Sequence, residues 1–361
     1  MKRCAIVQFE PRHEEVIPSL VAACNANGYR PRIFLHRRIL KLRGDIMALV
    51  PGLEFDVEYV PLSTPDYRAA DAPKHIKSTM AAIEAAEHDF VLMASLSRPK
   101  AASWARGVKK PLILVLHNLD QFSQMAPLRE TLQMPNARYI SLSAHVTAEW
   151  ISRVGKAHMD RIATLEPFYW IDDPEPKLVQ PRQVVIPGNV NMRTRDYPGL
   201  LDLLGNRPDA FQNLHFILPS GGGDRAKVES EIQDRKLDAR FTCVPLDNSG
   251  QVGHAAYFDA LAGAQVIHPL MPFDYEQYQR IKITSALSSS GGFCVPIVMD
   301  RWSEACYRPP MLIADNGLEA SLTRISEASD AELSDLQAAL KSYRRSALSN
   351  GAVGLRRLIE Q

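Results

Sequence analysis

Two segments in the second half of the chain carry side chains suited to binding a charged ligand that bears a base. The first, residues 187–195, reads Pro-Gly-Asn-Val-Asn-Met-Arg-Thr-Arg and follows a short apolar run. A glycine there lets backbone amides approach an anion closely, and an arginine offers forked donors to a diphosphate. The alternative is an ordinary strand-to-helix loop with solvated arginines. The candidate ligand residues of this turn are Gly188, Asn189, Asn191, Arg193 and Arg195.

The second segment, residues 268–286, follows another apolar strand and leads into a helix expected at about residues 280–288. Aromatic rings can stack on a base, a carboxylate can accept hydrogen bonds from ribose hydroxyls, and a lysine near helix-terminal amides can neutralise phosphates. Taken singly, such side chains are more often solvated loop residues. Their convergence at the end of one strand favours a nucleotide site. The candidates are Tyr275, Glu276, Tyr278, Lys282, Thr284 and Ser285.

Two polar clusters in the first half each follow an apolar strand directly. Glu10 and His13 come after the first strand, and either could act as general base for an acceptor hydroxyl if a neighbour raises the pKa of the acid or keeps the imidazole neutral. Glu14 is a third candidate, although an acid at this point also suits capping of the next helix. His117 and Asn118 follow the apolar run 112–116, where they either face the ligand crevice or form part of the core.

A basic stretch forms a separate feature of the first half. Residues 30–43 contain six arginines and lysines and no acid, interleaved with apolar side chains. Such a patch could dock on anionic lipid headgroups or receive a phosphate-bearing acceptor. The alternative is a strand followed by a solvated basic helix.

The elements that must position these residues alternate between apolar strands and amphipathic helices, which indicates α/β folding with parallel sheets. A chain of 361 residues exceeds what one hydrophobic core usually serves, so we expect two Rossmann-like βαβ domains facing each other across a cleft. Residues 166–182 hold four prolines and no periodicity, as interdomain connectors do. The predicted division is a first domain at 1–166, a linker at 167–182, a second domain at 183–335 and a helix at 336–361.

Composition excludes several classes of protein. The net charge of +1 gives no general attraction to nucleic acid. No apolar run approaches the ~18 residues that a membrane-spanning helix needs, and the first apolar run stops too early for a signal peptide. The five cysteines are scattered without a C-x-x-C pair, which predicts a reducing, cytoplasmic setting and no zinc site. Without an Asp-x-Asp motif, we expect no metal.

The two βα halves, the Pro-Gly-Asn-Val turn and the Lys-Ile-Thr-Ser-Ala segment followed by Cys-Val-Pro-Ile-Val resemble group 1-type glycosyltransferases of the GT-B fold, which assemble bacterial polysaccharides and other glycans. The resemblance is loose but spans nearly the whole chain. It implies that the C-terminal domain binds a nucleotide sugar, that the N-terminal domain binds the acceptor, and that the last helix returns to the N-terminal domain.

Some residues of the family's motifs have counterparts in this sequence, and one does not. Arg193 or Arg195, together with Lys282, resembles the basic residues at the diphosphate, and Glu276 resembles the first glutamate of the family's paired-glutamate motif. The second glutamate is absent, because Thr284 and Ser285 stand at that distance.

The histidines fit the family by position. His117 falls where members often place a histidine near the donor sugar, and His13 lies in the loop that supplies a catalytic group in several branches. We therefore expect His13 on the acceptor side of the cleft, and His117 with Asn118 at the donor sugar.

The implied activity is metal-independent transfer of a sugar from a nucleotide-sugar donor to a glycan, glycolipid or other hydroxyl acceptor, with no cofactor. It would take place in the cytoplasm, with peripheral attachment to the inner face of the membrane as an option. Two alternatives stay open: a nucleotide-sugar 2-epimerase of the same fold, and a catalytically silent GT-B protein that serves as a partner or regulatory subunit.

Overall fold

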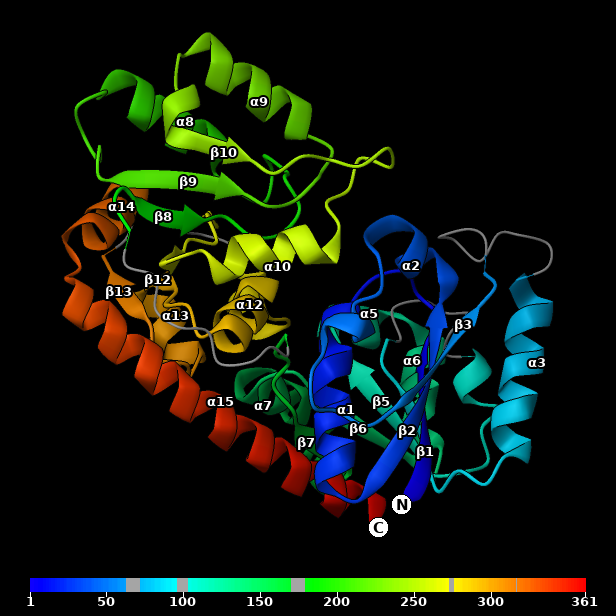
Figure 1. Ribbon diagram of the computed structural model, residues 1–361. Helices are drawn as coiled ribbons and strands as arrows, with labels where there is room; N and C mark the ends of the chain where they lie inside the picture. The colour runs from blue at the N-terminus through cyan, green and yellow to red at the C-terminus, as the bar shows by residue number, and fades with distance from the viewer. Residues whose placement is uncertain (63–71, 96–102, 170–178, 273–275, 316) are drawn as a thin grey trace.

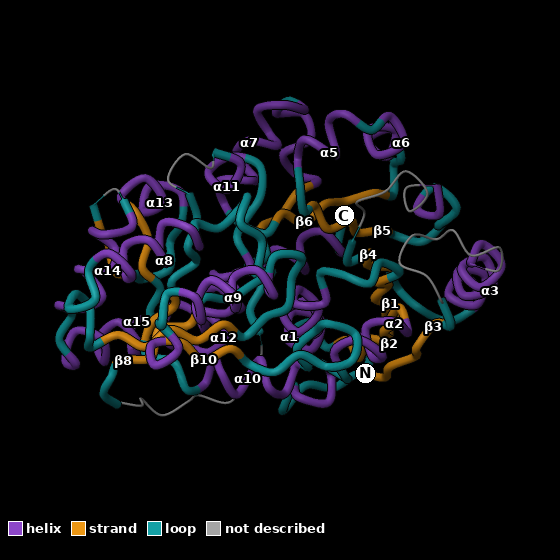
Figure 2. The backbone as a smooth tube through the Cα atoms, turned by 90° about the horizontal axis from the view of Figure 1, so that it is seen from above, coloured by secondary structure: helices purple, strands orange, loops and turns teal. Residues whose placement is uncertain are grey.

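The computed structural model describes residues 1–62, 72–95, 103–169, 179–272, 276–315 and 317–361. The described chain forms a seven-stranded parallel sheet in its N-terminal half, and a four-stranded parallel sheet with an adjacent two-stranded pair in its C-terminal half, with helices around them (Figure 1). Seen at 90° to that view, the strands of the two halves form separate groups (Figure 2). The predicted α/β class with two Rossmann-like halves is confirmed.

The sheet of the N-terminal half has seven strands in the order β3-β2-β1-β4-β5-β6-β7. β5 (Leu112–Leu116) lies inside this sheet and is buried at every position, as expected for a parallel strand covered on both faces. The other strands are β1 (Lys2–Gln8), β2 (Tyr29–His36), β3 (Asp56–Val60), β4 (Val91–Met93), β6 (Ala137–Ser141) and β7 (Ile162–Thr164). Its α-helices include α1 (Ile17–Ala26), α2 (Arg37–Arg43), α3 (Ala72–Ala85), α5 (Leu119–Gln124), α6 (Ala126–Arg129) and α7 (Ala144–Val154), and a short 3-10 turn, η1 (Glu14–Val16), precedes α1.

The C-terminal half has a four-stranded sheet in the order β10-β9-β8-β11, and a bridge between Ile267 and Ile297 joins it to the pair β12-β13. Its strands are β8 (Arg182–Val185), β9 (Leu214–Leu218), β10 (Phe241–Cys243), β11 (Val266–Ile267), β12 (Val298–Asp300) and β13 (Leu312–Ala314). Its helices are α8 (Tyr197–Asn206), α9 (Arg225–Asp234), α10 (His254–Ala262), α11 (Gln277–Arg280), α12 (Ser285–Phe293), α13 (Arg301–Cys306) and α14 (Leu318–Glu327).

The last helix, α15 (Asp330–Ile359), runs from the C-terminal half to the N-terminal half and ends near the start of the chain (Figure 1). Asn27, directly after α1, donates from Nδ2 to Ala352 O at 2.8 Å and accepts from Arg356 Nε at 2.8 Å. Residues 330–335, which the sequence assigned to the second domain, belong to this helix. Residues 170–178 of the predicted linker lie outside the described residues, and its last residue, Arg182, opens β8.

A continuous cluster of buried apolar side chains joins the two halves. It includes Ile17 and Leu20 of α1 together with Phe258 of α10 and Phe293 of α12. The rings of Phe258 and Phe293 lie 5.0 Å apart in an edge-to-face arrangement, a favoured geometry for aromatic pairs. The halves are therefore packed against each other. Among the described helices, none combines the length and hydropathy needed to cross a bilayer.

One helix differs from the prediction at a position that concerns the site. The helix expected at 280–288 is divided into α11, which ends at Arg280, and α12, which begins at Ser285. The Thr284 hydroxyl accepts a hydrogen bond from Ala286 N at 3.3 Å and so caps α12. Lys282 consequently lies in a short loop between two helices.

Candidate active site

A cavity of about 610 Å³ lies between the halves, at the carboxyl ends of β1, β5 and β6. The loops after those strands form one wall, and the segment from α11 into α12 forms the other. Open parallel sheets bind ligands at this edge. Of the residues singled out in the sequence, the cavity wall contains Glu10, His13, His117, Asn118, Tyr278, Lys282 and Ser285.

His13 and His117 face each other within this cavity. Their ring centroids are 4.2 Å apart and the ring planes are tilted by 31°. The Nε2 of His117 donates to Ala94 O at 2.7 Å, so the neutral ring keeps its lone pair on Nδ1. Burial and the nearby charge of His13 lower the pKa of His117 to about 3, against the opposing effect of the hydrogen bond to Ala94. His117 is therefore the neutral member of the pair.

His13 has the opposite electrostatic setting. Its Nδ1 lies 3.4 Å from Glu15 Oε1. Burial alone would lower the pKa of His13, but the hydrogen bond and charge of Glu15, helped by the charges of Glu10 and Glu14, raise it above its ordinary value. A general base must be neutral before it accepts a proton, and the raised pKa of His13 favours the protonated form instead.

The backbone of His13 is also unusual. Its φ of 65° and ψ of 25° lie in the left-handed region, which few residues other than glycine adopt. Strained positions of this kind cluster at functional sites.

Glu14 is not part of the cavity wall, in contrast to its proposed catalytic role. Its side chain is 3% exposed and its Oε1 lies 2.8 Å from Arg43 Nη1 and 3.4 Å from His254 Nε2. Burial alone would raise the pKa of Glu14, but contact with His254 and the charge of Arg43 hold that pKa well below its usual range. An acid engaged in this way cannot reach an acceptor in the cavity.

Lys282 and the start of α12 supply the opposite wall. The Nζ of Lys282 is 4.6 Å from the ring centroid of Tyr278, a cation–π contact that orients the ammonium. Ser285 stands at the first position of α12, where backbone amides and the helix dipole favour an anion. Thr284 is buried and used as a cap, so its hydroxyl serves the helix.

Among the described residues, none from the glycine-containing turn after β8 lines this cavity. Gly188 has a φ of 88°, and a side chain there would collide with the guanidinium of Arg195. Arg195 is buried and donates to Asn189 O at 3.2 Å and to Pro269 O, which corrects its assignment as a diphosphate ligand. Asn191 Oδ1 accepts from Arg193 N at 2.9 Å and shapes the turn, while the Arg193 side chain is exposed.

Two other predicted donor residues are not placed in the site. Tyr275 lies outside the described residues. Glu276 is exposed at the start of α11 and does not line the cavity.

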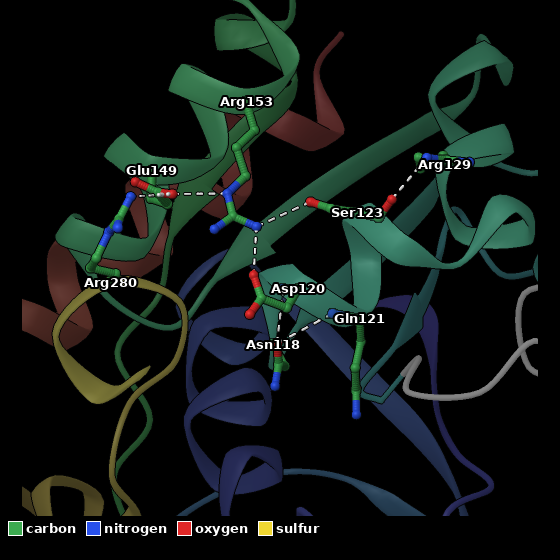
Figure 3. Close-up of polar contacts among 8 residues, drawn as sticks. All are labelled: Asn118, Asp120, Gln121, Ser123, Arg129, Glu149, Arg153 and Arg280. Atoms are coloured by element: carbon green, nitrogen blue, oxygen red, sulfur yellow. Dashed lines mark hydrogen bonds and ion pairs between the residues drawn. The ribbon is translucent and has the colours of Figure 1, made fainter. Parts of the chain in front are cut away.

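Asn118 is held by the helix that it starts (Figure 3). Its Oδ1 accepts from Asp120 N at 2.9 Å and from Gln121 N at 3.3 Å, so the carboxamide caps α5 at the cavity edge. Beside it, Arg153 bonds to Asp120 at 2.8 Å and to Glu149 at 2.8 Å. This network fixes α5 against α7.

Four polar residues of the wall were not singled out in the sequence: Arg12, Glu15, Gln121 and Ser288. Arg12 and Glu15 flank His13, and their sequence position was the available signal. Gln121 and Ser288 carry no signal that separates them from ordinary helix residues. The hydroxyl of Ser288 is buried and has no hydrogen-bond partner among the described residues.

The described residues contain no group of three or more histidine, cysteine or acidic side chains arranged to hold a metal ion. The described wall brings together cations, the amides at the start of α12 and two imidazoles, which suit a ligand with an anionic part.

Neither protein-family models nor curated proteins match the sequence. Solved structures do match the fold. Anabaena HepE, solved with UDP and glucose, is 12% identical over 100% of both chains with a TM-score of 0.66. WaaG, a glycosyltransferase involved in lipopolysaccharide biosynthesis, is 11% identical over 97% of this chain and 98% of its own, with a TM-score of 0.59. A putative UDP-N-acetylglucosamine 2-epimerase from Listeria monocytogenes is 14% identical over 96% of this chain and 98% of its own, with a TM-score of 0.52. The chain has the GT-B fold that these proteins share.

Proposed function

We propose that this protein is a glycosyltransferase that moves a sugar from a nucleotide-sugar donor to a hydroxyl acceptor bound between its halves. The observation that carries the proposal is the interdomain cavity, in which His13 and His117 face the Lys282 loop and the start of α12. The fold shared with HepE, which was solved with UDP and glucose, supports the same class of donor.

In this proposal the C-terminal wall holds the diphosphate. Lys282 and the amides near Ser285 neutralise its charge, and the imidazolium of His13 and the guanidinium of Arg12 add positive charge from the other side. As the anomeric C–O bond breaks, negative charge grows on the departing diphosphate. These fixed cations stabilise it without a metal ion.

The neutral His117 is suited to the sugar itself. Its Nδ1 accepts a hydrogen bond from a sugar hydroxyl, while its Nε2–H remains bound to Ala94 O. Glu10 lines the cavity on the side of the N-terminal half, and we assign its carboxylate to receive the acceptor proton. The new bond joins the acceptor oxygen to the anomeric carbon, and the nucleoside diphosphate leaves with the bonding electron pair.

Thermal shift with UDP-, GDP-, dTDP- and CMP-linked sugars tests the donor class. A ligand at 100 times its dissociation constant should add roughly 2.7 kcal/mol of stability. Stabilisation by one nucleotide family, followed by transfer to a hydroxyl acceptor, is the expected result. No stabilisation by any of the four would overturn the proposal.

The fold shared with the Listeria protein supports 2-epimerisation as the second candidate. Release of a free, epimerised sugar without an acceptor would establish that activity in place of transfer. The absence of a carboxylate eight residues after Glu276 favours a third candidate, a catalytically silent partner protein. Donor binding without turnover would support it.

The acceptor class and the place of action belong to the same proposal. We assign a glycan or lipid-linked acceptor in the cytoplasm, with attachment to an anionic membrane through residues 30–43. Three of the six cations are already paired within the protein, since Arg30 bonds to Asp56, Arg32 to Glu58 and Arg43 to Glu14. The membrane contact is therefore reduced to the remaining cations of α2.

A further inference from the structure

Glu14 is one of the most deeply buried acids of the described chain, and its contacts come from both halves. Arg43, the last residue of α2, lies 2.8 Å from its Oε1 within the N-terminal half. His254, the first residue of α10 in the C-terminal half, approaches the same oxygen to 3.4 Å. The side chains of Glu14 and His254 are only 3% and 4% exposed. The contact is thus a buried, charged junction between the halves.

The histidine of this junction is tied to the N-terminal half at a second point. Its Nδ1 lies 3.3 Å from Gly44 O, directly after α2. Both ring nitrogens of His254 therefore face an oxygen of the N-terminal half, one from Glu14 of η1 and one from Gly44, the residue after α2. Separation of the halves at this place would leave the buried Glu14 carboxylate without its contact to His254, and buried charges tolerate the loss of a partner poorly.

The junction is adjacent in sequence to the cavity wall. His13 and Glu15 line the cavity, whereas Glu14 between them does not. The turn is closed by a hydrogen bond from Val16 N to His13 O at 3.3 Å, and His13 holds a left-handed conformation at its start. In so short a turn the position of Glu14 fixes the backbone that presents His13.

We infer that Glu14 is a positioning residue: by binding His254 across the interface, it holds the loop that presents His13 and Glu15 to the ligand in the cavity. The inference rests on the proposed function for its catalytic consequence. Its structural part concerns the protein without ligand and is independent of that function.

The test compares Glu14→Gln and His254→Asn, which each change one partner of the Glu14–His254 contact, with Arg280→Gln. Arg280 also joins the halves, through Glu149 at 3.4 Å, but it is exposed and does not line the cavity. Amide hydrogen exchange is measured on the ligand-free proteins. Both junction variants should increase exchange in residues 9–16 at least about threefold, with strands β5 and β6 unchanged, and Arg280→Gln should not.

The catalytic arm measures UDP affinity and turnover of UDP-glucose. Glu14→Gln should keep the UDP dissociation constant within about twofold while turnover falls about tenfold or more, because a loop displaced by a fraction of an ångström misplaces His13. The double variant should be no worse than either single one, since both break the same contact.

Unchanged exchange in residues 9–16 overturns the inference, and so does a uniform rise in exchange throughout the chain. Turnover lost without faster exchange would instead make Glu14 itself a reacting group, which also overturns it. If the wild-type protein neither binds UDP nor turns over UDP-glucose, the proposed function loses support while the exchange measurement still decides the role of Glu14.

Discussion

Acidification should destabilise this protein through His117, and His117→Gln should remove that part of its pH dependence. In the unfolded chain the pKa of this imidazole is near its ordinary value of 6.5, and in the folded protein it is about 3. Between those two pH values only the unfolded chain binds the proton. Stability therefore falls as the pH drops below about 6.5.

The size of this effect follows from the pKa difference. A solution at pH 5 is about 1.5 pH units below the pKa of the imidazole in the unfolded chain. This difference corresponds to a loss of roughly 2 kcal/mol in unfolding free energy, at about 1.36 kcal/mol per unit. Because the ring is partly exposed, solvent screening reduces this to about 1 to 2 kcal/mol.

His13 affects the pH dependence of stability in the opposite sense, because its pKa is raised in the folded protein. Its contribution to stability is complete below the pKa of the unfolded chain and is lost as the pH rises through the pKa of the folded protein.

The assay is urea denaturation of the wild type and of His117→Gln at pH 7 and pH 5. Glutamine can still donate to Ala94 O, so the variant should fold. The loss of unfolding free energy between the two pH values should be smaller in the variant by about 1 to 2 kcal/mol. Asn118→Ala is the control, because loss of its cap lowers stability equally at both pH values. Parallel pH dependence of His117→Gln and wild type would refute the neutral assignment of His117.

Three further outcomes are expected. His13→Ala should cut transfer about a hundredfold in single-turnover assays of a donor-acceptor pair, while affinity for the nucleotide-sugar donor is retained because the charge that His13 stabilises grows only as the bond breaks; near-normal turnover would remove His13 from the mechanism. Lys282→Ala should weaken binding of UDP by calorimetry far more than binding of uridine, because its contribution is electrostatic, and equal loss for both ligands would contradict this role. Replacement of Arg37, Arg38 and Lys41 by glutamine should abolish salt-sensitive binding to phosphatidylserine vesicles, where each cation adds about 1 kcal/mol, and unchanged binding would exclude α2 as the contact.

The fold could be predicted because its strands are short apolar runs with clear ends. The run 112–116, between Pro111 and His117, is β5 without any change of bounds. The boundary of α12 could not be read as easily, because the apolar residues Ile283, Ala286 and Leu287 form a pattern compatible with one helix over residues 280–288. The capping hydroxyl of Thr284 overrides that pattern, and a threonine at this position is itself a signal for the start of a helix.

The sequence indicated which strand ends lie around the candidate cavity, but not the contacts within it. Both histidines were placed correctly after parallel strands, since topology brings the carboxyl ends of such strands to one edge. Their 4.2 Å approach depends on the backbone turn at His13, which the sequence pattern does not encode. Arg195 was misassigned because the carbonyl that it binds, Pro269 O, is 74 positions away, and only the folded chain brings the two together.

The side chains of residues 13–15 make different contacts because of the geometry of the turn in which they lie. Successive side chains in a 3-10 turn diverge by about a third of a turn, so Glu14 and Glu15 cannot share a face. Glu15 consequently meets His13 in the cavity, where its charge favours the imidazolium, while Glu14 meets His254 of the other half. Two adjacent glutamates are thus not interchangeable. One sets the charge of the group that faces the ligand, and the other makes the position of that group depend on contact between the halves.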